Sequence, residues 1–275
     1  MINSAKKNIN IFVLIILIAI SFFPLFWMIS TSFKTTEDIF SRPPHLIPPE
    51  FSLKNYAKIF SPYFLNFFKN SIIVTCGAVL LSLSVATLAG YSFSRFRYHG
   101  ILIFQIFILM AQMFPLILLL ISIYIFFSKL HLLDTRLSLV LAHCSFSLPF
   151  SIWMLKGFFD SVPIELEEAA KIDGCPRMKI LFRIILPLVK PGLVATSIYI
   201  FLLSWDDYVF ALQLISSTGK RTVPVGLVLS FLGEFQYAWG ELMAGSLAVS
   251  IPVICLFIYI QKHLVHGLTA GAVKG

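Results

Sequence analysis

Six long apolar runs with almost no charge limit the fold of this chain more than any other feature. They cover about residues 9–29, 71–91, 101–127, 137–158, 184–203 and 242–260. A helix of about 20 apolar residues spans the hydrocarbon core of a bilayer, and it satisfies its own backbone hydrogen bonds there. We therefore predict an all-α membrane protein with six transmembrane helices.

Composition supports a membrane protein and excludes several other classes. Of 275 residues, 58% are hydrophobic and 12% are charged, whereas a soluble domain carries about 25% charged residues. The net charge of +8 is spread between the apolar runs without a basic, aromatic-rich cluster, so we predict no nucleic-acid partner. The four cysteines lack metal-ligand spacing, and we predict neither a metal site nor a disulfide framework.

The charge distribution predicts how the chain is oriented. Six spans place both termini on one side of the membrane. With the amino terminus inside, 12 of the 21 Lys and Arg residues fall in or beside cytoplasmic segments. Positive charge is enriched in cytoplasmic loops, so we expect both termini and the loop after the fourth span to be cytoplasmic. We expect three parts: residues 1–70 with the first helix and an external loop, a core of five helices at 71–263, and a tail at 264–275.

A polar stretch from Ser161 to Pro187 interrupts the apolar pattern between the fourth and fifth runs. Ser161 can cap the start of a helix, and Pro163 suits a first helical turn. Gly174 can take the left-handed conformation that ends a helix, after which Pro176 can open a second one. We predict a short helix at about 161–175, a sharp corner, and a helix that returns to the membrane.

The short helix has the features of a docking surface. Glu165, Glu167 and Glu168 lie near its positive end, where carboxylates are favoured. Ala169 and Ala170 leave its surface bare, so we expect another backbone to approach closely.

The same stretch resembles a known motif. Glu168-Ala169-Ala170, Gly174, Ile184 and Leu186-Pro187 have the spacing of the EAA loop, which marks the membrane-spanning subunits of bacterial ATP-binding-cassette importers. The resemblance implies the type I importer transmembrane fold. It also implies that residues of the short helix couple the chain to an ATPase: Glu165, Glu168, Ala169, Ala170, Asp173 and Gly174.

Two further segments resemble one branch of that family. Residues 70–100 resemble the maltose-type carbohydrate importers, though less specifically than the EAA loop does. The tail, including Gly267, Thr269, Gly271 and Lys274, resembles the tail of the second permease of those systems, which contacts the ATPase dimer. Composition alone indicates a disordered end.

These resemblances imply a permease subunit of a binding-protein-dependent, ATP-driven sugar importer in the bacterial cytoplasmic (inner) membrane. The implied partners are a second permease subunit, usually a different chain, two ATPase subunits and an external sugar-binding protein. Residues 218–222 lack the pattern of a phosphate-binding loop, because Leu214 and Arg221 replace its first glycine and its hydroxyl residue. We therefore expect no cofactor and no catalysis in this chain, with ATP and Mg²⁺ bound by the ATPase subunits.

Polar residues inside the runs are candidates for a pathway or for helix contacts. Gln105 and Gln112 are seven residues apart, so we expect them to share a face of the third span and to line a pathway. For His143 we favour a hydrogen bond to another helix.

Ala78, Ser82, Ala86 and Gly90 recur every fourth residue, which predicts a stripe of close helix packing.

A secondary carrier or channel for a small polar solute remains the alternative. Such carriers usually place carboxylates in the middle of the membrane, whereas all 13 acidic residues here fall in loops or at span ends. Asp206 and Asp207 come closest, just after the fifth run. Members of the resembled family tend to carry Asn at the position of Asp206, which puts any amide-specific contact there in doubt.

Overall fold

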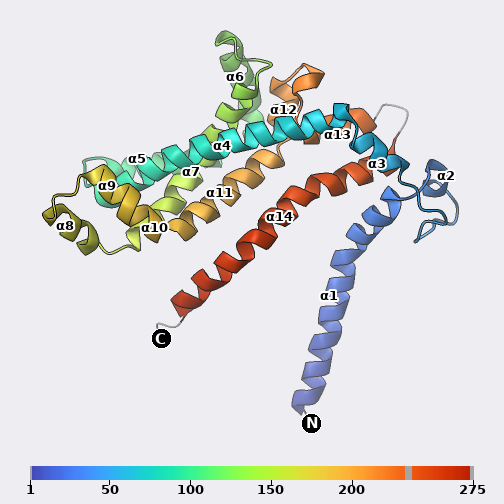
Figure 1. Cartoon of the computed structure of the whole chain (residues 1–275), viewed down its shortest axis with the longest axis horizontal. Coiled ribbons are helices and arrows are strands. Elements are labelled where there is room, and N and C mark those ends of the chain that lie inside the picture. The colour runs from blue at the N-terminus through green and yellow to red at the C-terminus, as the bar shows by residue number, and fades with distance from the viewer. Residues whose placement is uncertain (1, 233–236, 273–275) are drawn as a thin grey trace. The chain divides into compact units, whose positions relative to one another are not determined.

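The computed structural model describes residues 2–232 and 237–272, with side chains described for 10–232, 237–259 and 261. The regular elements of these ranges are helices (Figure 1). In order they are α1 (Ile2–Ser32), α2 (Thr36–Ile39), α3 (Lys54–Ile59), α4 (Pro62–Arg95), α5 (Ile101–Met110), α6 (Leu116–Lys129), α7 (Arg136–Asp160), α8 (Glu165–Ile172), α9 (Arg177–Ile180), α10 (Leu186–Leu188), α11 (Lys190–Trp205), α12 (Val209–Leu214), α13 (Val223–Phe231) and α14 (Trp239–Ala272).

Membrane-spanning helices account for most of this architecture. Four described helices are individually long and apolar enough to cross a bilayer: residues 10–32, 62–95, 136–160 and 239–259. The count reaches six when each of two bent helix pairs is taken as one span. The predicted first, second, fourth and sixth spans are therefore single helices, whereas the third and fifth are broken.

The third span breaks at Pro115. Helix α5 ends at Met110, a 3₁₀ turn covers Ala111–Met113, and the axis turns by 100° into α6. Phe114 has an extended backbone (φ −72°, ψ 128°), as expected for a residue whose helical conformation is disfavoured by the proline that follows. The span expected at about 101–127 therefore consists of two helices joined at a break. Figure 1 shows α6 turning away from α5.

The fifth span breaks where two prolines remove backbone donors. After α9, a π-helical turn covers Leu181–Ile185, and the short α10 contains Pro187. The axis then bends by 81° into α11, with Pro191 in its first turn. Because Pro187 and Pro191 cannot donate to the preceding turns, the unbroken helix begins at Lys190, six residues later than the predicted start at Ile184.

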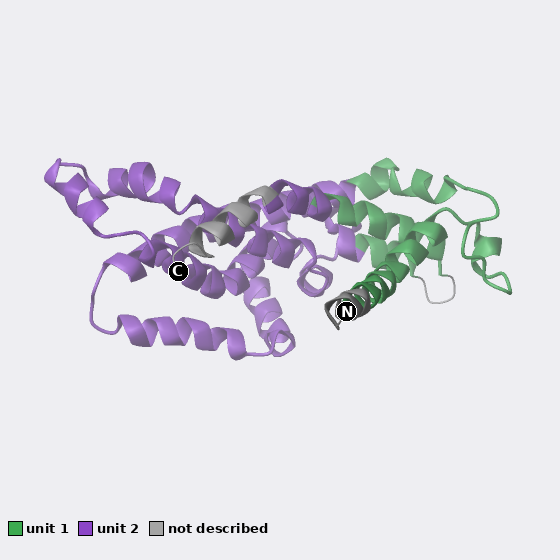
Figure 2. Ribbon diagram, turned by 90° about the horizontal axis from the view of Figure 1, so that it is seen from below, with its two compact units in different colours: residues 1–65, 226–252 green, residues 66–225, 253–275 purple. Residues whose placement is uncertain are grey.

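Packing divides the chain into two compact units, coloured in Figure 2. Unit 1 consists of residues 1–65 and 226–252, and unit 2 consists of residues 66–225 and 253–275. The division predicted from the sequence, at residues 70 and 263, describes placement across the membrane and stays a prediction. In unit 1, the Phe64 and Phe231 rings pack with their centroids 5.6 Å apart, and the Ser32 and Tyr56 hydroxyls lie 2.8 Å apart.

The core of unit 2 includes the predicted stripe of small residues. Ala78, Ser82 and Ala86 on α4 are completely buried. The Ser147 hydroxyl on α7 donates to the Ser82 hydroxyl over 2.9 Å. A Cβ atom at Gly90 would lie only 3.1 Å from the Lys156 backbone nitrogen of α7. The stripe therefore lets α4 and α7 pack with their backbones close together, as predicted.

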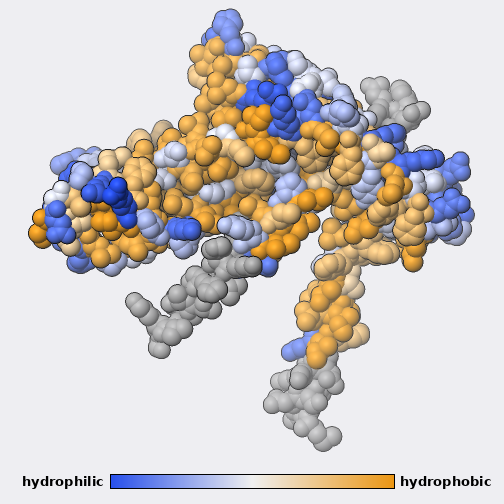
Figure 3. Space-filling model, in the orientation of Figure 1, coloured by the Kyte–Doolittle hydropathy of each residue, from blue (hydrophilic) through white to orange (hydrophobic). Residues whose placement is uncertain are grey.

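The flanks of the bent third span remain apolar and uncovered within the described chain. Exposed fractions reach 75% for Ile103 on α5 and 70% for Ile117 and Ile121 on α6. In Figure 3, the visible face of α6 is mostly hydrophobic below a hydrophilic tip. Surfaces of this kind are stable in lipid or against another apolar protein surface.

We predict that Ala86→Leu destabilises the packing of α4. Ala86 has no exposed surface, so three added carbons must push helices apart at a cost of about 1–3 kcal/mol. The thermal midpoint of the detergent-solubilised protein should fall. Val85→Leu is the matched control, because Val85 is 40% exposed on the same helix. A midpoint equally insensitive to both changes would show that the stripe does not stabilise the fold.

Candidate functional site

Helix α8 lies within the stretch that was predicted to be a docking helix, but it begins later than expected. It starts at Glu165 after Ile164, and no side chain caps it. Ser161 instead ends α7, and its hydroxyl donates to the Phe158 carbonyl over 2.7 Å. The prediction that Ser161 caps α8 is therefore wrong. Glu165, Glu167 and Glu168 do occupy the first turn, where the helix dipole favours carboxylates.

The end of α8 is closed by a Schellman motif at Gly174. The Cys175 N–H donates to the Ala170 carbonyl and the Gly174 N–H donates to the Lys171 carbonyl, each over 3.0 Å. Gly174 has φ +77°, which confirms the predicted left-handed corner. Pro176 follows in an extended conformation and precedes α9, so the chain turns back within a few residues.

The two alanines of the EAA motif face in different directions. Ala169 is exposed, whereas Ala170 is 7% exposed and packs in the core of unit 2. The prediction that both are bare for a partner is thus wrong for Ala170. The uncovered face of α8 combines acidic and apolar side chains, with Ile172 88% exposed and Leu166 44% exposed. Glu165, Glu168 and Asp173 are also exposed.

The inner face of α8 carries a buried carboxylate, Glu167, which the sequence placed among the acidic residues of the docking helix without predicting its burial. The Glu167 side chain is 2% exposed. Its Oε1 lies 2.5 Å from Arg95 Nε, and its Oε2 accepts a 2.8 Å hydrogen bond from the Tyr91 hydroxyl. Arg95 Nη2 also donates to the Val162 carbonyl over 2.8 Å. The end of α4, the linker before α8 and α8 itself are therefore joined at one point.

Further polar contacts connect this point to the end of α7. Arg95 Nη1 lies 3.1 Å from the Ser94 hydroxyl, which donates to Asp160 Oδ1 over 2.6 Å. Lys156 pairs with the other oxygen of Asp160, also at 2.6 Å. Two basic and two acidic side chains thus form a balanced network across the ends of α4, α7 and α8. Arg95 and Glu167 are 72 residues apart along the chain, and nothing in the sequence pattern identified them as partners.

A second buried polar cluster lies deeper in unit 2. His143 on α7 is 1% exposed, and its Nδ1 lies 2.7 Å from the Ser204 hydroxyl on α11, which confirms the predicted helix-to-helix hydrogen bond. Its Nε2 lies 3.2 Å from Asp207 Oδ2. Asp207 also accepts from the Phe210 and Ala211 N–H groups at the start of α12. The sequence offered no acid near His143, because Asp207 is distant along the chain.

The two glutamines predicted to line a pathway do not share one helix face. Gln105 is half-buried on α5, whereas Gln112 lies in the 3₁₀ turn after α5 ends. Their seven-residue spacing therefore does not place them on one face of an α-helix. Gln112 is exposed, and its amide lies 3.4 Å from the Phe146 carbonyl. A nearby open cavity of about 370 Å³ is lined by Tyr199, Leu202, Leu203, Asp206 and Asp207.

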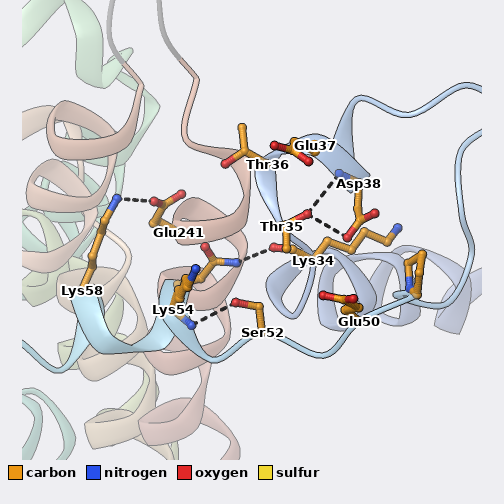
Figure 4. A pocket seen from close by; sticks show the side chains of 12 residues that line it. Lys34, Thr35, Thr36, Glu37, Asp38, Glu50, Ser52, Lys54, Lys58 and Glu241 are labelled. Carbon is orange, nitrogen blue, oxygen red and sulfur yellow. Dashed lines mark hydrogen bonds and ion pairs between the residues drawn. The ribbon is translucent and has the colours of Figure 1, made fainter.

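Unit 1 contains a larger polar cavity of about 630 Å³. Its walls mix charges of both signs, and Figure 4 shows Lys58 bonded to Glu241 on one side and Thr35 bonded to Asp38 on the other. Lys34 is nearly buried, and its ammonium lies 4.3 Å from the centre of the Trp27 ring. Burial lowers the pKa of Lys34.

The segment compared with a phosphate-binding loop has a structural role. Lys220 donates to the Asp134 carbonyl over 2.7 Å and to Oδ2 of its carboxylate over 2.8 Å. Burial by itself raises the pKa of Asp134, but hydrogen bonds from Lys220 and Ser217 outweigh it and hold this pKa well below its usual range. The φ angle of Gly219 is not in the left-handed region. Its carbonyl accepts hydrogen bonds from the side-chain amides of Asn66 and Asn70.

The predicted ATPase-contacting tail is only partly described. Gly267, Thr269 and Gly271 fall in the last part of α14, where the backbone but not the side chains is described. Lys274 lies outside the described residues. The prediction for the tail therefore stays a prediction.

Comparison with protein families identifies the chain. Residues 78–269 match the family described as "Binding-protein-dependent transport system inner membrane component". The match includes α8, the Gly174 corner and the helices that support them. The chain belongs to this family.

Curated relatives cover nearly the whole permease chain. It is 36% identical to the inner membrane ABC transporter permease protein YcjP of Escherichia coli, over 95% of this chain and 94% of that one. It is 37% identical to the trehalose/maltose transport system permease protein MalG of Thermococcus litoralis, over 98% of each chain. It is 38% identical to the diacetylchitobiose uptake system permease protein DasC of Streptomyces coelicolor, over 92% of each. These relatives are transport permeases and not enzymes.

A solved structure shares the fold. A chain of a bacterial ABC transporter that imports the acidic polysaccharide alginate superimposes with a TM-score of 0.83, over 94% of this chain and 96% of that chain. At 22% sequence identity, this likeness establishes the fold alone. The permease is thus an all-α, multi-pass membrane protein with the fold of an ABC importer subunit.

We predict that Gly174→Val disrupts α8 without preventing membrane insertion. A β-branched residue at φ +77° costs about 1–2 kcal/mol or more, and the Schellman bonds weaken with it. Co-purification of the ATPase with the membrane-inserted variant should fall, and transport should be lost. Gly157→Val is the control, because a Cβ at Gly157 meets nothing within 4 Å and its backbone φ is not positive. Full ATPase recovery and transport with Gly174→Val would contradict the coupling role that the resemblance to the EAA loop implies for this corner.

Proposed function

We propose that this permease forms half of the translocation pathway of an ATP-driven sugar importer and couples to an ATPase through α8. The observation that carries the proposal is the construction of α8. It is a short helix with exposed Leu166, Ile172 and Glu168, fixed to the membrane helices by buried Glu167 and closed by Gly174. A helix held firmly on one side and bare on the other is suited to receive force from a partner.

The substrate class rests on the relatives. Their names specify trehalose or maltose in one case and diacetylchitobiose in another. Both are at least 37% identical to this chain over nearly their full lengths. We therefore assign a small oligosaccharide as the transported solute.

The proposed mechanism places the chemistry of ATP in other subunits. Two ATPase subunits bind ATP and Mg²⁺ in the cytoplasm, and the closure of their dimer displaces α8. The ATPase surface would contact four exposed residues in or directly after α8, namely Glu165, Glu168, Ala169 and Asp173. Ala170 and Gly174 would hold the shape of the helix.

The tail at residues 264–275 would add a second contact with the ATPase dimer, through Gly267, Thr269, Gly271 and Lys274.

The remaining partners follow from the family. A second permease subunit, usually a different chain, would complete the pathway, and its surface would cover part of the exposed apolar helices. An external sugar-binding protein would deliver the solute on the side of residues 33–70. Gln105 and Gln112 remain candidates for the pathway wall.

A direct test measures uptake of radiolabelled maltose, trehalose and diacetylchitobiose by bacteria that express the complete transporter. We expect uptake of at least one sugar, and its loss when this chain is deleted or when the phosphate-loop lysine of the ATPase is changed to alanine. Uptake that depends on this chain but persists with the inactive ATPase would favour the secondary carrier or channel instead.

The proposal also predicts that α8 and both termini are cytoplasmic. In a chain whose native cysteines are replaced, Lys171→Cys and Thr269→Cys should resist a membrane-impermeant thiol reagent in intact cells. Lys54→Cys should react, because it lies in the proposed external loop. Permeabilised cells provide the control for reactivity, and labelling of Lys171→Cys from outside would overturn the orientation.

A further inference from the structure

The buried ion pair between Arg95 and Glu167 has a consequence beyond the stability of the fold. We infer that it is a positioning pair that makes α8 and the cytoplasmic end of α4 move as one unit. Displacement of α8 by the ATPase would then reach α4 directly and not only through α7 and α9, its neighbours along the chain. The inference deepens the proposed function and rests on it for the identity of the ATPase partner.

Helix α8 is held at more than one point. Ala170 packs in the core of unit 2 and provides an apolar contact, which does not by itself set the rotation of the helix. Glu167 lies three residues earlier on the same face. Its two oxygens are held separately, by Arg95 at 2.5 Å and by Tyr91 at 2.8 Å. These directional bonds fix the rotation of α8 relative to α4.

Arg95 lies where it can hold the linker before α8 as well as α8 itself. Its guanidinium also donates to the Val162 carbonyl in the linker that leads into α8. One side chain of α4 therefore holds both the helix and its linker. Short backbone segments connect α8 to α7 and α9, and the Gly174 corner can adjust its angles more freely than a side chain held by three partners.

The energetics of the buried pair also favour a positioning role. Burying a carboxylate and a guanidinium costs desolvation energy, and well-packed apolar residues in place of such a pair are often as stable or more stable. Stability alone therefore does not require charges at this position. The buried pair instead provides directional, charge-assisted bonds that hold one geometry.

The movement can be measured directly in the complete complex. Nitroxide labels at Leu88→Cys on α4 and Lys171→Cys on α8, in a background without native cysteines, report the distance between the two helices. Both side chains are exposed in the chain. With the pair intact, we expect the same distance distribution without nucleotide and with ATP bound to a hydrolysis-deficient ATPase. An ATP-dependent change in this distance would overturn the inference.

Variants separate positioning from stability. Glu167→Gln should retain the ATPase subunits but broaden the distance distribution, and it should lower sugar transported per ATP hydrolysed by about tenfold, a typical magnitude for coupling between sites. The double variant Arg95→Met/Glu167→Met should recover the thermal midpoint of the wild type without recovering this ratio. Glu50→Gln, an exposed carboxylate in unit 1, is the control for the chemical change.

The outcomes distinguish this inference from the proposed function. If the double variant recovers both the midpoint and the transport ratio, the pair serves stability only and the inference fails. If Glu167→Gln does not assemble, the double variant decides by the same two measurements. If the wild-type complex hydrolyses ATP but transports none of the three sugars, the proposed function fails, while the distance measurement still decides whether α4 and α8 move together.

Discussion

Close packing between α4 and α7 is the constraint on which the rest of unit 2 depends. Helices in lipid gain no hydrophobic free energy by meeting each other, so small residues that let backbones approach provide much of the attraction. Ala78, Ser82, Ala86 and Gly90 form such a surface on α4. The same packing brings the end of α4 beside the end of α7, where Ser94 reaches Asp160. The position of Arg95, and therefore of α8, follows from it.

The charged network at this end has a different physical basis from the apolar core that it adjoins. Apolar contacts determine which helices meet, but they permit small rotations and shifts. Arg95, Glu167 and Tyr91 add bonds of fixed direction at the place where α8 leaves the membrane helices. An element that transmits movement needs this definition more than it needs extra stability, because a helix that rotates in place absorbs the displacement applied to it.

The two broken spans show how proline alters a membrane helix without removing it. Pro115 lies at a 100° turn, and Pro187 and Pro191 flank an 81° bend. Donors and acceptors released by such breaks must find partners, since lipid offers none. The π-helical turn at Leu181–Ile185 keeps the backbone hydrogen-bonded up to the second break. Irregular backbone of this kind is tolerated where protein or water, and not lipid, surrounds it.

The sequence by itself determined the features that depend on local chemistry or on lipid. These include the apolar helices, the small-residue stripe, the family, and the left-handed corner that only glycine adopts without strain at Gly174. Tertiary structure alone decided which side chains meet across long distances along the chain. It buried Ala170, paired Glu167 with Arg95, and brought Asp207 beside His143. It also placed Gln105 and Gln112 in helices of different types. The physical reason is that periodicity predicts the face of one helix, whereas the partner of that face depends on how several helices pack together.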